Sequence, residues 1–275
     1  MRWLIISLLC LAACSGGTDP AQPPAPPKPA PSLSPAQSLS PGQSLSWDFE
    51  VGTFPNPADQ PNLVPPVVLT EINGNHYGRL TGSPSDCSTT DFILWDPCPQ
   101  IREQVRIWTI PEVEGETRTF SLTVRIPSAG QPATGHDSML WQLLEPGPNS
   151  TRTIWFGIRD FGAGQHFYVA NQVPPCPTGC TYIPVIAKGD YANVVDLGPV
   201  VFDQWMTIQL DMTLAATPTN GTLIVRKNGA VVQTISNQPT TWLPTGLTQD
   251  VKIDVLDWSG TLGIADFDNL SAEEN

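Results

Sequence analysis

The sequence predicts an all-β protein, a two-sheet jelly-roll sandwich, and three observations lead to this fold class. Short runs of alternating or β-branched residues recur between Gly, Pro and Asn turn signals over roughly 230 residues. None of these runs keeps a helical period for long. The pair Asn228-Gly229 stands between two apolar runs, and Asn-Gly readily adopts the positive φ angles of a two-residue hairpin turn. Many short strands of this kind pack as two sheets around one core.

The apolar runs give the expected strands in chain order. They stand at 46–51, 67–72, 104–110, 119–126, 139–144, 153–158, 167–170, 205–212, 221–227, 231–235, 251–256 and 262–270. The domain that they form is expected to span 45–275.

The residues before this domain resemble the signal of bacterial lipoproteins. Arg2 precedes a short apolar run, which ends in Leu11-Ala12-Ala13-Cys14. The resemblance implies a signal peptide over 1–13, cut before Cys14, and a lipid on the Cys14 thiol. An ordinary secretory signal with a chance cysteine is the alternative. We expect a lipid-anchored protein of the bacterial cell envelope, at the outer membrane or cell surface, with no other membrane contact.

A Pro-rich segment over 14–44 follows the lipidation cysteine. Pro23-Pro24 and Pro26-Pro27 exclude a helix or the interior of a sheet. The segment is expected to be an extended linker, at about 3.1 Å per residue where it adopts polyproline II.

The charge and the cysteine content restrict the possible binding partners and the cell compartment of the protein. The formal net charge is -13, and no basic patch is visible, which argues against nucleic acid as a partner. Four further cysteines, an even number in an exported chain, favour disulfides. Of three possible connectivities, local pairing is the simplest, with a zinc site as the competing interpretation. The pairs would be Cys87–Cys98 and Cys176–Cys180.

Several short motifs over 46–272 resemble the concanavalin A-like jelly-roll superfamily. Its polysaccharide lyases, heparin-lyase-like and alginate-lyase-like, are the nearest match in motif order. The motifs are Asp48-Phe49-Glu50 in the first run, Trp205-x-x-Ile208-x-Leu210, Gly221-Thr222-Leu223-Ile224-Val225, Asn228-Gly229 and Phe267-Asp268-Asn269-Leu270. The resemblance implies that a concave sheet surface binds polysaccharide.

The alginate-lyase-like families carry Arg-x-Glu-x-Arg, Gln-x-His and Lys-x-Gly-x-Tyr on three strands. Alternate residues of a strand share a face, so each motif lines the concave sheet. This chain keeps the basic residues and the glutamine, but Gln104 stands at the glutamate position, Leu144 at the histidine and Leu256 at the tyrosine. The resemblance therefore implies substrate binding by Arg102, Gln104, Arg106 and Lys252, and a place for Gln142 in the catalytic site.

Replacements for the missing acid and base are expected on a neighbouring strand. His166 and Tyr168 stand two residues apart, and a His/Tyr pair can act as base and acid near neutral pH. Arg159 on the preceding strand would contact the same substrate. Tryptophans stack on sugar rings, and three of them alternate with polar residues as candidates for the groove: Trp108, Trp155 and Trp258.

Carboxylates at both ends of the domain predict a structural calcium ion. First and last strands often lie side by side in such sandwiches, and the resemblance implies a calcium ion held between them. The expected ligands are Asp48, Glu50, Asp266 and Asp268. A solvated polar face is the alternative.

Three functions remain open from the sequence. The first is a monomeric surface lipoprotein that binds an acidic polysaccharide in the groove. The second is an active polysaccharide lyase that cleaves uronic-acid polymers by β-elimination. The third is a structural or adhesive envelope protein without a specific ligand.

Overall fold

The structure is a computed structural model, and it describes most of the expected domain. The described residues are 42–54, 66–82, 101–132, 138–145, 151–162, 164–171, 193–216, 220–241, 248–258 and 263–275, and the side chains at 101–104, 145, 151–153, 193 and 256–258 are outside the description. The predicted signal peptide, linker and lipidated Cys14 lie outside the described residues, as do Cys87, Cys98, Cys176 and Cys180.

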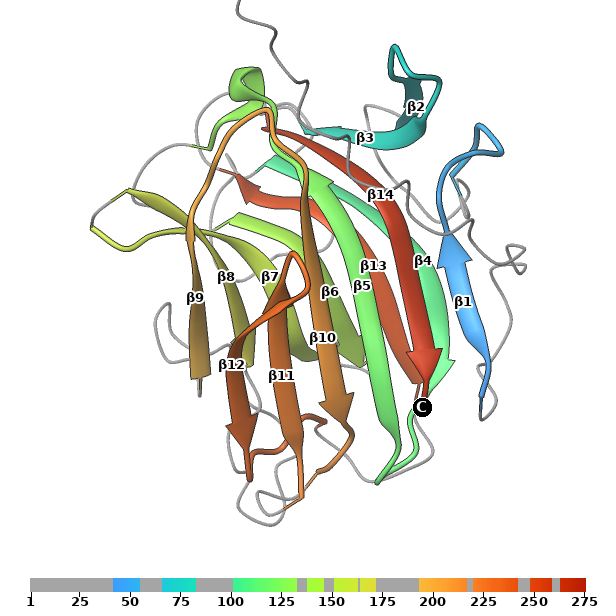
Figure 1. Cartoon of the computed structure of the whole chain (residues 1–275), viewed down its shortest axis with the longest axis vertical. Coiled ribbons are helices and arrows are strands. Elements are labelled where there is room, and N and C mark those ends of the chain that lie inside the picture. The colour runs from blue at the N-terminus through green and yellow to red at the C-terminus, as the bar shows by residue number, and fades with distance from the viewer. Residues whose placement is uncertain are drawn as a thin grey trace, which may run out of the picture.

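Two antiparallel sheets pack face to face (Figure 1), which confirms the predicted jelly-roll sandwich. The eight-stranded sheet runs in the order β12 (Ala230–Ser236), β11 (Thr222–Lys227), β10 (Met206–Thr213), β5 (Thr117–Arg125), β14 (Gly263–Glu274), β3 (His76–Gly82) and β2 (Val67–Thr70), with β1 (Ser44–Trp47) also paired to β14. The six-stranded sheet runs in the order β4 (Ile101–Pro111), β13 (Thr248–Trp258), β6 (Ser138–Glu145), β7 (Thr151–Asp160), β8 (Gln165–Asn171) and β9 (Asn193–Pro199). A short 3-10 helix, Ser128–Gly130, follows β5.

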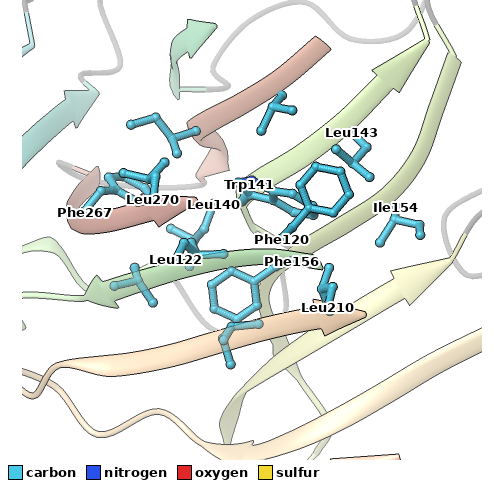
Figure 2. Packing of buried hydrophobic residues seen from close by; sticks show 14 of the residues in the cluster. Phe120, Leu122, Leu140, Trp141, Leu143, Ile154, Phe156, Leu210, Phe267 and Leu270 are labelled. Carbon is cyan, nitrogen blue, oxygen red and sulfur yellow. The ribbon is translucent and has the colours of Figure 1, made fainter. Parts of the chain in front are cut away.

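The core lies between the sheets, because alternate residues of the central strands point inward and are mostly apolar, with Arg118 of β5 as a buried exception. On β5 and β10 the inward residues are fully or almost fully buried, and the residues between them are half-exposed. Phe120 of β5 meets Trp141 of β6 across the layer, with ring centroids 5.7 Å apart. Figure 2 shows Phe120, Trp141, Phe156 and Leu210 in this packing. The two sheets therefore share one continuous hydrophobic core.

Each predicted strand overlaps an observed one, and two observed strands were missed. The missed strands, β3 and β9, contain Gly78, Gly82, Gly198 and Pro199, residues that weaken a strand pattern in the sequence. The first prediction extends too far, because β1 ends at Trp47. Phe49 has a φ of 62° and accepts a hydrogen bond from the Gly52 amide, which closes a turn after β1.

The Asn-Gly hairpin is confirmed. Lys227 and Ala230 are register partners, and the two residues between them, Asn228 and Gly229, both have positive φ. The Asn228 side chain also accepts a hydrogen bond from the Thr207 amide at 2.9 Å, which ties the turn to β10. Among the residues described here, no helix is long and apolar enough to span a membrane.

Candidate functional site

The candidate site is the face of the six-stranded sheet that points away from the core, which we call the outer face. On β7 and β8 the core takes Phe156, Ile158, Phe167 and Val169, so the residues between them belong to the outer face. A separate buried cluster of Met139, Trp155, Tyr168 and Ala170 lies there.

Directly opposed residues of neighbouring strands share a face. Register pairs therefore define one row across all six strands, from β4 to β9: Arg106, Lys252, Gln142, Trp155, Ala170 and Val194. This row places the basic residues, the glutamine and a tryptophan side by side.

The β4 end of the row is basic but interleaved with carboxylates. Arg106 Nη1 lies 3.4 Å from Asp250 Oδ2, and the Arg106 side chain is 37% exposed while that of Asp250 is 7% exposed. The Thr109 hydroxyl donates to Asp250 Oδ1 at 2.7 Å. Asp254, two residues from Lys252 on β13, is fully buried. The carboxylates offset part of the positive charge at this end.

Three predicted binding residues have only their backbone described. Arg102 is the register partner of Leu256, Gln104 that of Asp254, and Trp258 that of Ile101. Trp108, a candidate for the groove, is 2% exposed and lies in the core, the usual place for a tryptophan. The register shifts between Val251 and Lys252, so β4 has an extra residue there and the following side chains change face.

Polar groups in the middle of the row are buried. Gln142 is 1% exposed, and its Oε1 accepts no hydrogen bond within the described part of the chain. Trp155 Nε1 donates to the Tyr168 hydroxyl at 2.9 Å, and the Arg159 guanidinium carbon lies 5.5 Å from the Tyr168 ring centroid. The Tyr168 ring crosses Gly157, where a Cβ would collide with the Ser138 carbonyl and lie 3.2 Å from Tyr168 Cε1. Glycine at 157 therefore allows both the strand pairing and the ring position.

At the β9 side, His166 is paired with a carboxylate. Its Nδ1 lies 2.9 Å from both oxygens of Asp196, and the Gly198 amide donates to Asp196 Oδ1 at 2.7 Å. Burial disfavours the charged form of Asp196, but the hydrogen bonds from Gly198 and His166 outweigh it and lower the pKa of this carboxyl. The Phe161 ring lies 5.5 Å from the His166 ring and is 39% exposed.

The structure thus places His166 and Tyr168 on one face, with Arg159 beside them as the register partner of His166. The two side chains differ in exposure, since His166 is 16% exposed and Tyr168 is fully buried. The sequence analysis missed Asp196, because the strand that carries it has few strand signals. The Asp-x-Gly spacing, typical of a carboxylate that caps a turn, was the one available hint.

Asp266, a predicted calcium ligand, lies between two arginine side chains. Its fully buried carboxylate accepts hydrogen bonds from Arg79 at 2.6 and 2.9 Å and from Arg125 at 2.9 Å, so it is the counter-ion of two arginines. Over the described ranges, no three His, Cys, Asp or Glu side chains form a group that could hold a metal ion.

The other three predicted ligands lie near one another after β1 and in β14. Glu50 accepts hydrogen bonds from the backbone and the ring of His76, and Asp48 accepts one from the Glu50 amide. Asp268 is 5% exposed and accepts a hydrogen bond from Asn75 at 3.0 Å. Burial, and to a smaller degree the charges of Asp48 and Glu50, raise the pKa of Asp268 to about 6. Calcium binding by these three carboxylates stays a prediction.

Comparisons with known proteins find likeness in structure alone. No model of a protein family matches the chain, and no curated protein matches it. Endo-β-1,4-glucuronan lyase from the fungus Trichoderma reesei aligns with a TM-score of 0.55 at 14% identity, covering 82% of this chain and 94% of the lyase. Alginate lyase Aly36B aligns with a TM-score of 0.54 at 11% identity, covering 85% and 98%.

A substituted form of Aly36B in complex with alginate tetrasaccharide aligns with a TM-score of 0.51 at 12% identity, covering 86% and 98%. These structural neighbours are polysaccharide lyases with a jelly-roll fold, and this chain shares that fold.

Proposed function

We propose that the outer face of the six-stranded sheet binds an acidic polysaccharide. The observation that carries the proposal is the row across all six strands, which joins Arg106 and Lys252 to Gln142 and Trp155. Arg106 and Lys252 are partly exposed and can contact a sugar carboxylate, whereas Gln142 and Trp155 are buried beside them.

The chemistry of the row favours a carboxylate-bearing sugar. Guanidinium groups bind carboxylates in a bidentate way, and ammonium groups add a point charge. Arg106 already has Asp250 as a partner at 3.4 Å, longer than a good charge-assisted hydrogen bond. A sugar carboxylate can therefore compete for the half-exposed guanidinium.

Binding of uronic-acid polymers to the full chain tests the proposal. Arg106→Gln and Lys252→Gln should each weaken binding by about 10- to 100-fold, since one charge-assisted contact contributes roughly 1.5–3 kcal/mol. Added salt should weaken binding to the unchanged protein, because it screens charges over about 10 Å at 0.1 M.

Arg226→Gln is the matched control, because Arg226 is a partly exposed arginine on the opposite sheet with its own carboxylate partner, Asp211. Its affinity should equal that of the unchanged protein. Equal binding of neutral glucans, together with no effect of the Arg106 and Lys252 substitutions, would refute the proposal.

A second function, cleavage of the bound polymer by β-elimination, is favoured by the His166–Asp196 pair. In this reaction His166 Nε2 takes the proton from C5 of the uronic residue, and the C5–H electron pair forms the C4–C5 double bond. The C4–O bond breaks, and the leaving oxygen takes a proton from solvent, because the Tyr168 hydroxyl is fully buried.

Absorbance of the unsaturated product in the near ultraviolet tests this second function. His166→Gln should reduce product formation by about 10²–10⁴-fold, the usual contribution of a general base, and leave binding within about twofold. A wild-type protein that binds uronic-acid polymers and releases no unsaturated product has the binding function alone.

A further inference from the structure

We propose that Asp196 is a positioning residue that keeps the proton of neutral His166 on Nδ1 and so leaves Nε2 as the proton acceptor. The inference rests on the elimination reaction proposed above. Neither the motifs of the sequence nor the structural neighbours assign a role to Asp196.

The geometry between the two side chains determines the tautomer. An ionised carboxylate only accepts hydrogen bonds, so a ring nitrogen 2.9 Å from both of its oxygens must carry the hydrogen. In a neutral imidazole with a proton on Nδ1, the lone pair is on Nε2. The base of a β-elimination needs that lone pair, and a histidine with the other tautomer cannot accept the proton there.

Asp196 is itself fixed from two directions. The Gly198 amide donates to its Oδ1 at 2.7 Å, in a turn where Gly198 has a φ of 84°. Lys227 of the opposite sheet donates to the Leu197 carbonyl at 2.6 Å, and its charge helps to keep Asp196 ionised. The carboxylate therefore stays in place and charged when a ligand arrives.

The charged surroundings of His166 come from three strands. Arg159 faces it from β7 and Asp196 from β9, the charge of Lys227 on β11 acts on Asp196, and the Phe161 ring packs against the imidazole. Asp196 is the carboxylate among these groups that bonds to the ring. This arrangement makes Asp196 the group that decides which nitrogen carries the hydrogen.

A second histidine–carboxylate pair serves as an internal control. His76 Nδ1 lies 3.1 Å from Glu50 Oε2 on the other sheet, in a pair of the same chemistry whose histidine is more exposed, 33% against 16% for His166. The chain has three histidines, so their ring signals can be assigned by substitution.

Long-range ¹H–¹⁵N NMR of the full chain at about pH 8, where imidazole is neutral, tests the tautomer. The hydrogen of His166 is expected on Nδ1, and Asp196→Ala should abolish that single tautomer and leave His76 unchanged. Glu50→Ala should do the reverse. A His166 hydrogen on Nε2, or a His166 spectrum that Asp196→Ala does not change, would overturn the inference.

Kinetic measurements on Asp196→Ala distinguish the proposed role of Asp196 from the proposed elimination reaction itself. Asp196→Ala should lower kcat for unsaturated product at least about tenfold and change KM by less than about twofold, because the carboxylate acts on the base and not on the substrate. If the wild type releases product and Asp196→Ala releases it at the same rate, the role of Asp196 is refuted and elimination stands. If the wild type releases none, the elimination fails, and with it the catalytic role of Asp196.

Discussion

At the scale of single residues, the hydrogen bond between Trp155 and Tyr168 shows how the outer face keeps polar atoms buried. Tyr168→Phe removes the acceptor of the Trp155 Nε1 hydrogen and should lower the free energy of unfolding by roughly 1–3 kcal/mol. Trp155→Phe with Tyr168→Phe should cost less than the sum of the two single changes, because it removes both partners. Urea denaturation gives the free energy of unfolding of the unchanged protein, the two single variants and the double variant. Strict additivity would show that this bond contributes nothing specific.

The ionisation of Asp268 makes the stability of the fold depend on pH. Its folded pKa of about 6 is above the ordinary 3.8, so the native state binds the proton more tightly than the unfolded chain. The stabilisation from protonation is complete below about pH 4 and is lost as the pH rises through 6. In the ionised form this shift costs roughly 2–3 kcal/mol, since one pKa unit corresponds to about 1.4 kcal/mol.

Asp268→Asn should therefore raise the Tm at pH 8 and leave it nearly unchanged at pH 4. Asp211→Asn is the control of opposite sign: burial opposes ionisation of Asp211, but hydrogen bonds from Gln209, Arg226 and Thr119 lower the pKa of Asp211. That substitution should lower the Tm at pH 8. Thermal unfolding scans at pH 4 and pH 8 measure the Tm of each variant. A lower Tm of Asp268→Asn than of the unchanged protein at pH 8 would contradict the view that ionisation of Asp268 destabilises the fold.

Calcium would reverse the effect of the Asp268 substitution. If calcium bound Asp48, Glu50 and Asp268 in the folded state alone, it would stabilise the fold by about 2.7 kcal/mol at a hundredfold excess over its dissociation constant. Calcium should then raise the Tm of the unchanged protein and not that of Asp268→Asn. A Tm that neither calcium nor a chelator changes would exclude the predicted ion.

At the scale of elements, Asp266 ties three neighbouring strands of the eight-stranded sheet together. Its carboxylate on β14 bonds to Arg79 of β3 and Arg125 of β5, and the Arg125 guanidinium also stacks on Tyr77 and Trp205. Asp266→Asn should lower the free energy of unfolding by about 3–5 kcal/mol, because two guanidinium groups lose a buried counter-ion.

Asp211→Asn is again the matched control, since the Asp211–Arg226 pair joins β10 and β11 but both side chains are more exposed. Its cost at neutral pH should be about 1 kcal/mol or less. Equal costs of the two substitutions, measured by denaturant unfolding, would show that burial of the Asp266 carboxylate does not matter.

Strand positions could be predicted where residues alternate cleanly, as in β5 and β10, because the alternation is a direct result of burial on one side. β3 and β9 were not predicted, because contacts with neighbouring strands hold them in the sheet although they contain Gly78 and Pro199. The same holds for the site. The two-residue spacing of His166 and Tyr168 gives their common face, but their different burial depends on neighbouring strands. The partners of Asp266, Arg79 and Arg125, are far from it in sequence, so the sequence alone could not predict these ion pairs.

At the scale of the whole molecule, we expect the segment before β1 to attach the protein to the membrane through the lipid on Cys14. Cys14→Ser removes the thiol that the lipid would occupy and should release the protein from the membrane fraction, because no other membrane contact is expected. Cell fractionation with detection of the protein measures this. Unchanged membrane association of the variant would contradict lipidation at Cys14.

The position of β14 also determines the order in which the molecule can be assembled. This strand follows all the other described strands in chain order, and it lies between β5 and β3 while also pairing with β1. The eight-stranded sheet therefore has a gap in its middle until β14 has left the ribosome. Contacts of such high sequence separation form slowly, and the earlier strands expose unpaired edges meanwhile. A chain cut even a few residues before Gly263 would lose the centre of its sheet, not its margin.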